Sequence, residues 1–190
     1  MFAAGASKIS AMSESATTAL LVVDIQNMLT DALDPQRREA FLRIVADLLE
    51  RARAEGVPIV HVQHQDEELV PGTVGWELAS GVAPRNGEPV VAKRYRDAFR
   101  ETELADLLAH RHVGHVVVCG MQTEFCVDAT VREADRRGYR VTLVEDGTAT
   151  FPVKGASEAQ IAAQVHRVAR GQVAAIVPAA ELFVKDAVTR

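Results

Sequence analysis

Short, valine-rich apolar runs alternate with helical periodicity along the chain, and this alternation constrains the fold more than any other feature of the sequence. The runs cover residues 20–24 (LLVVD), 57–62 (VPIVHV), 90–92 (VVA), 115–119 (HVVVC), 140–144 (RVTLV) and 173–177 (VAAIV). Continuous apolar runs of this length are typical of strands that are covered on both faces, as in a parallel sheet. The sequence therefore predicts a buried parallel sheet.

Helical patterns lie between these runs. Residues 41–52 carry apolar side chains at i, i+3, i+4, i+7, i+8 and i+11, and Gly56 follows as a stop signal. Further helices are predicted at 104–108, at 125–137, and after Ser157, which forms a capping-box pattern with Gln160. Strands that alternate with helices imply right-handed crossovers and an α/β fold, a three-layer α/β/α sandwich.

Two segments depart from this alternation. Residues 1–16 are small and polar and lack the apolar stretch of a signal peptide, so we predict a flexible N-terminal arm before a domain of residues 17–190. Residues 63–89 show little periodicity and hold three of the seven prolines. A long irregular segment inside a compact domain is often a functional loop.

Charge and cysteine content exclude several classes of protein. The formal net charge of -5 leaves no basic surplus for a nucleic-acid backbone, so no nucleic-acid partner is expected. No apolar run approaches the roughly 20 residues that cross a bilayer, so no membrane partner is expected. The two cysteines, Cys119 and Cys126, are too few for a disulfide framework, which favours a reducing, cytoplasmic location.

Chemically active residues follow three of the predicted strands. In an open parallel sheet, ligands bind beyond the carboxyl ends of the strands. Asp24 ends the first run, Lys93 follows the third, and Cys126 lies in the first turn of the helix after the fourth. A carboxylate can accept a thiol proton, a lysine can hold that carboxylate, and the thiolate can attack a carbonyl. These residues are therefore the predicted catalytic group.

Each of these residues also has a purely structural interpretation. A free cysteine is often a small core hydrophobe, which is how we interpret Cys119. Asp24 could be a turn-forming residue, and Lys93 could be a solvated strand end. For Cys126, the positive end of the helix dipole favours the thiolate, and the unpaired N–H groups of the first turn could stabilise an oxyanion.

Metal and cofactor motifs are weak. His61, His64 and Asp66 lie close in sequence, but i and i+3 on a strand point to opposite faces, so joint ligation requires the chain to turn after Val62. The turn at Gly120 matches neither a dinucleotide-binding nor a P-loop pattern. We therefore expect no metal and no cofactor, and a small molecule as the substrate.

Three aromatic residues are candidates for the wall of a substrate pocket. Trp76 lies in the irregular segment and is the first choice, and Tyr95, two residues after Lys93, is the second. Phe125 lies about 100° around the helix from Cys126 and is assigned to the core.

Three segments of the sequence resemble a known family. The segments LVVDIQNML (21–29), VVAKRYRDAF (90–99) and VVVCGMQTEFCVDATVREADRRGYRVTLVEDGTAT (116–150) are similar to the isochorismatase-like cysteine hydrolases. This superfamily includes nicotinamidase, N-carbamoylsarcosine amidase, biuret and ureidoacrylate hydrolases, and isochorismatase. The resemblance implies six parallel strands in the order 3-2-1-4-5-6 and a triad of Asp24, Lys93 and Cys126. It also implies a cis peptide between Met121 and Gln122, with the N–H groups of Gln122 and Cys126 forming an oxyanion hole.

Two departures narrow the function that the resemblance implies. Nicotinamidases hold a metal with an Asp-x-His pair and a further His, which residues 61–66 do not reproduce. Enzymes that cleave isochorismate typically lack the nucleophilic cysteine, whereas Cys126 is present. The expected function is that of a metal-independent cysteine amidohydrolase that cleaves a small amide, ureido or carbamoyl substrate through a Cys126 thioester.

Two alternatives remain open. One is vinyl-ether hydrolysis of the isochorismatase type, which needs Asp24 and Lys93 but not Cys126. The other is a catalytically silent member that acts in binding or assembly, because a fold does not prove a function. Relatives are usually oligomers, so we expect an even-numbered homo-oligomer, a dimer or tetramer, with 147–158 as a contact segment.

Overall fold

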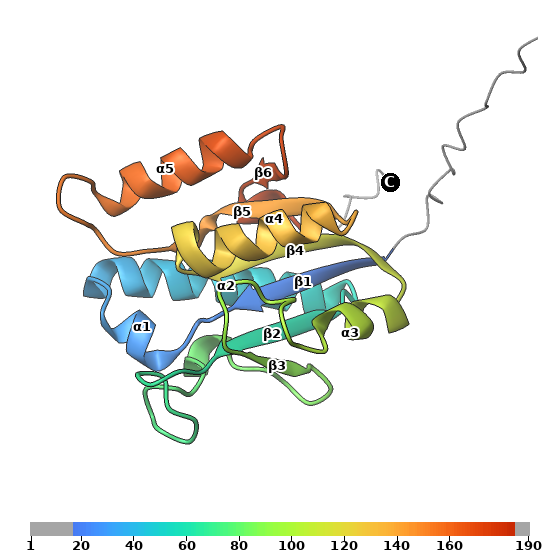
Figure 1. The fold of residues 1–190 in the computed structure, drawn as a ribbon, viewed down its shortest axis with the longest axis horizontal. Coiled ribbons are helices and arrows are strands. Elements are labelled where there is room, and N and C mark those ends of the chain that lie inside the picture. The colour runs from blue at the N-terminus through green and yellow to red at the C-terminus, as the bar shows by residue number, and fades with distance from the viewer. Residues whose placement is uncertain (1–16, 185–190) are drawn as a thin grey trace, which may run out of the picture.

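The computed structural model describes residues 17–184, so the predicted arm of residues 1–16 lies outside the described residues. Its sheet has six strands: β1 (Thr17–Val23), β2 (Ile59–His64), β3 (Val90–Lys93), β4 (Val113–Met121), β5 (Arg140–Ala149) and β6 (Ala175–Val177). Every neighbouring pair is parallel, and the strand order is β3-β2-β1-β4-β5-β6. The predicted parallel sheet and its order are confirmed (Figure 1).

The helices are α1 (Asn27–Asp31), α2 (Pro35–Ala54), α3 (Leu104–His110), α4 (Asp128–Arg136) and α5 (Glu158–Ala169). Two short 3-10 turns, η1 (Ser80–Val82) and η3 (Ala179–Glu181), and a π-helical turn, η2 (Thr123–Val127), accompany them. The four helices expected from periodicity are confirmed, including the capping box between Ser157 and Gln160. Helix α2 begins before its apolar stripe, because the Asp34 side chain caps it and Pro35 suits its first turn. The short helix α1 was not predicted.

Helices cover both faces of the sheet, which confirms the three-layer architecture. In Figure 1, α2 lies behind the strands, while α3 and α4 lie in front of them. One core cluster joins the strands to α3, α4 and α5, and a second joins them to α2, η1 and η3. Strand β1 lies at the centre, and its residues 19–23 are fully buried. Asp24, the polar residue that follows β1, therefore lies at the edge of a core from which water is excluded.

Gly120 of β4 lies directly against the backbone of Val23 at the carboxyl end of β1. A Cβ atom placed on Gly120 would lie 2.0 Å from the carbonyl oxygen of Val23, and Gly120 has a φ of +134°. Only glycine fits this contact without strain. Asp24, immediately after Val23, adopts a left-handed φ of +52°. The pairing of Gly120 with Val23 thus places the turn after β4 beside Asp24.

The irregular segment predicted at 63–89 begins slightly later than expected, because β2 continues to His64. After β2, its described helical or strand content is the single turn η1 and one isolated bridge between Gln26 and Leu78. The N–H groups of Asn27 and Met28 donate to the carbonyls of Glu77 and Gly75, respectively, each at a distance of 2.9 Å. The segment is thereby tied to the chain that leaves β1, close to Asp24.

Among the helices within residues 17–184, none has the combination of length and apolar character that crossing a bilayer requires.

Candidate active site

The structure brings Asp24, Lys93 and Cys126 together at the carboxyl edge of the sheet. Asp24 follows β1 and Lys93 ends β3, and each is only 1% exposed. The Lys93 Nζ atom lies 2.6 Å from Asp24 Oδ2 and 3.2 Å from Cys126 Sγ. An ammonium therefore lies beside both the carboxylate and the thiol. Three residues separated by up to 102 positions in the sequence thus form one cluster.

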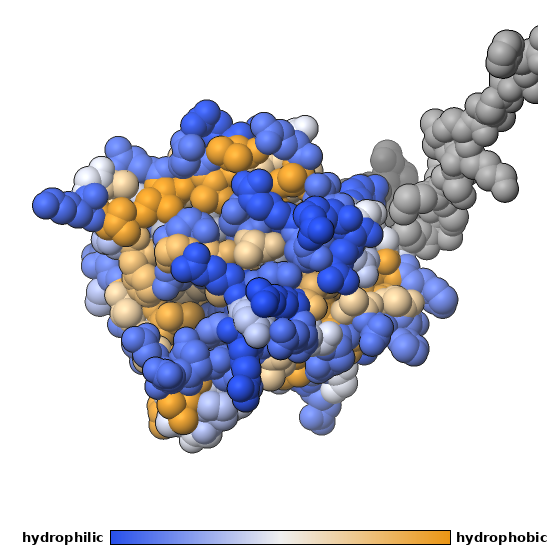
Figure 2. Space-filling model, viewed as in Figure 1, coloured by the Kyte–Doolittle hydropathy of each residue, from blue (hydrophilic) through white to orange (hydrophobic). Residues whose placement is uncertain are grey.

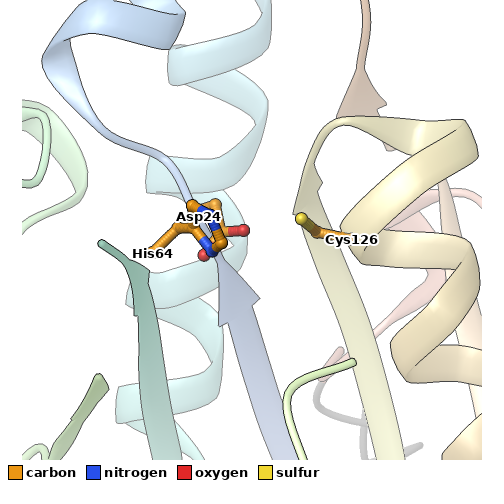
Figure 3. A group of neighbouring side chains, drawn as sticks. All are labelled: Asp24, His64 and Cys126. Carbon is orange, nitrogen blue, oxygen red and sulfur yellow. The ribbon is translucent and has the colours of Figure 1, made fainter. Parts of the chain in front are cut away.

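Cys126 is held by the π-helical turn η2, which leads directly into α4. The N–H groups of Phe125 and Val127 both donate to the Gln122 carbonyl, at 3.1 and 3.2 Å. The peptide bond between Met121 and Gln122 is cis, as the family resemblance implies. Figure 3 shows the Cys126 sulfur directed toward Asp24 across the space between the strands and the helix. A single π-helical turn within an α-helix is frequently found at functional sites.

Burial dominates the ionisation of the acid and the thiol. Desolvation raises the pKa of Asp24, and the Lys93 ammonium opposes this shift. Burial also raises the pKa of the Cys126 thiol to about 12, and the negative charge of Asp24 adds to this effect. The expectation that the helix terminus favours a thiolate at Cys126 is therefore wrong for the resting site. The resting sulfur is a protonated thiol, and a base must remove its proton.

A fourth residue, His64, joins the cluster and was missed as a partner of Lys93. Its Nδ1 atom lies 3.0 Å from Lys93 Nζ, and its Nε2 atom lies 3.2 Å from Asp66 Oδ2. Ligand-type atoms of Asp24, His64 and Cys126 all lie within 4.8 Å of one another, which resembles a metal site. The Lys93 ammonium, at 2.6 to 3.2 Å from each of these residues, is the cation that they surround.

His61, the other histidine of the weak metal motif, does not face this cluster. It is fully buried, and its Nε2 atom lies 3.1 Å from Glu88 Oε2. Arg53 donates to both oxygens of the same carboxylate, at 2.7 and 2.9 Å. His61 therefore belongs to an ion-pair network that holds the start of β3, as strand alternation would suggest.

A cavity of about 190 Å³ opens beside the thiol. Its wall is formed by side chains from the chain after β1, the loop after β2, the segment after β3 and the η2 turn: Asp24, Met28, Leu29, His64, Asp66, Glu68, Leu69, Arg96, Met121, Gln122, Phe125 and Cys126. Apolar and charged groups are thus mixed around a small space.

Phe125 lines this cavity, so its assignment to the core is wrong. It is 37% exposed, and the Arg96 guanidinium lies 4.2 Å from its ring centroid. The angular estimate assumed α-helical spacing, whereas the turn is π-helical and places successive side chains closer together around the axis.

The structure does not place Trp76 or Tyr95 on this wall. The Trp76 carbonyl accepts hydrogen bonds from the Gln26 and Gln63 side chains, both at 2.8 Å, so Trp76 anchors the loop. The Tyr95 ring lies under the Arg100 guanidinium, at 3.9 Å, and its carbonyl accepts from Lys93. The chain turns after Lys93, so Tyr95 does not continue the strand face toward the cavity.

The sheet order and the acid, lysine and thiol at its carboxyl edge define a class of protein, the α/β cysteine hydrolases that the sequence resembles. Residues 18–178 match the model of the isochorismatase domain. The chain therefore belongs to the isochorismatase family.

Sequence and structural similarity to individual proteins supports this family assignment. The chain is 42% identical over 142 residues to a streptothricin hydrolase of Streptomyces noursei, covering 73% of this chain and 56% of that protein. It thus spans little more than half the length of that relative. It is 36% identical over 179 residues to the isochorismatase family protein YddQ of Bacillus subtilis (strain 168), covering 89% and 99% of the two chains. A crystal structure of an isochorismatase from Pseudomonas putida KT2440 superimposes with a TM-score of 0.78 at 31% identity, covering 86% and 88%.

Proposed function

We propose that this isochorismatase-family protein is a metal-independent cysteine amidohydrolase that cleaves a C–N bond of a small amide, ureido or carbamoyl compound. One observation carries the proposal: the Lys93 ammonium lies 2.6 Å from the Asp24 carboxylate and 3.2 Å from the Cys126 sulfur. A nucleophile, a base and a cation that serves both are what thiol-dependent acyl transfer requires. The placement of the ammonium between its neighbours supports a reaction that needs no metal at this position.

The first half of the reaction forms a thioester. Asp24 takes the proton of the Cys126 thiol, and the sulfur attacks the substrate carbonyl carbon. The buried Asp24 carboxylate interacts with the Cys126 thiol through a side-chain hydrogen bond, so it is in place to receive this proton. The backbone N–H groups of Gln122 and Cys126 stabilise the oxyanion. Asp24 then gives its proton to the departing nitrogen, the C–N bond breaks, and the acyl group remains on sulfur.

The second half of the reaction returns the enzyme to its resting state. Asp24, again ionised, removes a proton from a water molecule, and the resulting hydroxide attacks the thioester carbonyl. The C–S bond breaks, and the sulfur regains the proton from Asp24. Lys93 keeps the carboxylate in place throughout, and the product is a carboxylic or carbamic acid.

The size of the cavity restricts the substrate. Ligand pockets usually measure about 300–1,000 Å³, so a cavity of about 190 Å³ is small for a ligand site. The relative named streptothricin hydrolase supports hydrolysis as the reaction type. We propose that the cavity takes a small substrate whole or the scissile end of a longer one.

Trapping of the acyl group on Cys126 tests this function. A panel of small amides, ureas and carbamates is incubated with the protein, and the mass of the Cys126 peptide is measured after acid quenching. We expect an acyl adduct with at least one substrate, and a loss of kcat of at least about a thousandfold in Cys126→Ala and in Asp24→Asn.

The other buried thiol provides the control for this test. Cys119→Ala removes a sulfur from the core without touching the cavity, so turnover is expected to persist. Turnover of a vinyl ether by both the wild type and Cys126→Ala, without any adduct, would favour vinyl-ether chemistry. If no compound of the panel is turned over and none leaves an adduct, the catalytically silent member is favoured.

We also propose that the protein forms an even-numbered homo-oligomer. Figure 2 shows apolar side chains gathered along α5 and the turn before it. Val153 in this turn is 58% exposed, and Ile161, Val165 and Val168 of α5 are only half-buried. A surface of this kind is typical of a protein interface. Light scattering at micromolar concentration is expected to give at least twice the 20.6 kDa mass of the chain, and a monomeric mass would contradict the proposal.

A further inference from the structure

The Lys93 ammonium has more neighbours than protons. Four acceptor atoms surround Nζ: Asp24 Oδ2 at 2.6 Å, His64 Nδ1 at 3.0 Å, the Tyr95 carbonyl at 3.1 Å and Cys126 Sγ at 3.2 Å. A lysine has three N–H donors and no acceptor. The orientation of these three protons therefore decides which of the four atoms are stabilised. The proposed mechanism accounts for the carboxylate and the sulfur, but it leaves the imidazole without a role.

The hydrogen bonds determine the protonation of His64. Because an ammonium can only donate, the Nδ1 atom that faces Lys93 must carry a lone pair. The Nε2 atom then carries the proton, and it faces Asp66 Oδ2 at 3.2 Å. His64 is thus a neutral imidazole whose tautomer is selected by a carboxylate. The hydrogen-bond partner of one ring nitrogen commonly sets the protonation of the other in this way.

Both the backbone of His64 and its carboxylate partner are held in place. The His64 N–H donates to Gln26 Oε1 at 2.9 Å, and the His64 carbonyl accepts from Gln26 Nε2 at 3.0 Å. Gln26 is itself fully buried. The Asp66 Oδ1 atom accepts from the N–H groups of Glu68 and Leu69, at 2.9 and 2.7 Å, which leaves Oδ2 for the imidazole. The imidazole therefore has one orientation, set from both sides.

We propose that His64, held by Asp66, is a positioning residue for the hydrolytic reaction, which orients the Lys93 ammonium toward Asp24 and Cys126. The inference rests on the proposed function and adds a residue to it. By accepting one proton of the ammonium, neutral His64 fixes the rotation about the Cε–Nζ bond, and this sets how the other two protons are directed among Asp24, Cys126 and the Tyr95 carbonyl. Protonated His64 can no longer accept, and its charge lies 3.0 Å from a second cation. The orientation is then lost.

The charged groups around His64 set the direction of its pH dependence. Asp24 faces it from the end of β1, Lys93 from the end of β3, Asp66 from the loop after β2 and Cys126 from η2, with Glu68 and Arg96 farther along the cavity wall. Burial lowers the pKa of His64, the Lys93 charge lowers it further, and Asp24 and Asp66 oppose the shift. The neutral form is thus the working form at neutral pH, and activity declines as acid protonates the ring.

Two substitutions at His64 test the role. His64→Asn keeps an acceptor oxygen near the position of Nδ1 but cannot titrate, whereas His64→Leu removes the acceptor at similar volume. At pH 8, with an amide that the wild-type chain turns over, we expect kcat to fall about 10- to 100-fold in His64→Leu. In His64→Asn we expect a loss of less than about threefold. Circular dichroism and thermal melting establish that each variant is folded.

The pH profile and the imidazole nitrogen shifts provide readouts that a merely structural residue would not move. On the acid side of the pH profile, the slope of log kcat/KM against pH is expected to be smaller by one in His64→Asn than in the wild type. Nitrogen-15 shifts of the wild-type ring at pH 8 are expected to show protonated Nε2 and unprotonated Nδ1. Asp66→Asn preserves the loop turn but weakens the tautomer selection, and Glu67→Gln, an exposed neighbour, is the matched control that leaves the profile unchanged.

The outcomes separate this inference from the function on which it rests. If the wild-type chain turns over no amide, the proposed function fails, and the inference fails with it. If the wild type is active but His64→Leu matches His64→Asn, or if Nδ1 carries the proton, the function stands and the positioning role is refuted. Rescue by asparagine together with the expected tautomer supports it.

Discussion

Replacing Lys93 by methionine would test whether Lys93 stabilises the buried, ionised carboxylate of Asp24. Lys93 and Asp24 are each 1% exposed, and their charged atoms lie 2.6 Å apart. Methionine has a similar length and no charge, so it leaves the carboxyl buried without its cation. Removing one partner of a buried pair typically costs about 3–5 kcal/mol of unfolding free energy. We expect a loss in this range at neutral pH.

The loss should depend on pH in a defined direction. An Asp carboxyl in an unfolded chain has a pKa of about 3.9. Burial already raises the pKa of Asp24 in the wild type, and Lys93 opposes this shift, so the variant raises it further. A group with a raised folded-state pKa contributes its stability below the unfolded pKa and loses it as the pH rises through the folded value. Between the folded pKa of the wild type and that of the variant, the variant loses about 1.4 kcal/mol more per pH unit.

Urea denaturation at pH 5, 6, 7 and 8 measures this effect. The double variant Asp24→Asn/Lys93→Met removes the titrating group, so the extra pH dependence should vanish and part of the stability should return. Lys154→Met, at an exposed position, is the matched control, with an expected change within about 0.5 kcal/mol. A Lys93→Met cost that is independent of pH, or single losses that simply add in the double variant, would refute the reasoning.

Three further predictions concern the edge of the sheet. Gly120→Ala places a Cβ atom 2.0 Å from the Val23 carbonyl oxygen, so we expect a loss above about 4 kcal/mol, measured by urea denaturation, and a smaller loss would mean that the strands can separate. Because the pKa of the Cys126 thiol is about 12, its alkylation by iodoacetamide should be slow at pH 7 and should accelerate tenfold per pH unit up to pH 10, whereas fully buried Cys119 stays unmodified in the native protein. Phe125→Leu should raise KM with little change in melting temperature, and a large loss of stability with unchanged kinetics would assign the ring to the core after all.

The sequence predicted the fold well because its strands are buried on both faces. Each apolar run then stands out without any alternating pattern, and the end of the run marks the carboxyl edge. Strand lengths were less predictable. Strand β5 continues past Val144 although Glu145 and Asp146 interrupt the apolar run, because the ladder to β4 resumes between Gly120 and Thr148. Backbone pairing to a neighbour, and not side-chain hydropathy, determines that extension.

His64 shows what the sequence could have revealed about the site but did not. Its partner Lys93 lies 29 positions away, so no local spacing connects them. In the sheet, however, β2 and β3 are paired in a register that sets His64 opposite Lys93. Aligning the ends of the predicted strands would have placed the two residues side by side. Phe125 was missed for a different reason, because no sequence pattern distinguished the π-helical turn from an ordinary first turn.

The geometry around Lys93 explains how a thiol with a raised pKa can still be the nucleophile. When the proton moves from Cys126 to Asp24, the negative charge moves from a site 2.6 Å from the ammonium to one at 3.2 Å. With an effective dielectric constant of about 20, the attraction to the ammonium changes from about 6.4 to about 5.2 kcal/mol. The transfer therefore sacrifices only about 1 kcal/mol of ion-pair energy, and the net charge of the buried cluster stays constant. The same transfer removes the Asp24 charge that helps to hold the thiol protonated. Without the lysine, the thiolate would be an unpaired buried charge, which the surrounding apolar core strongly disfavours.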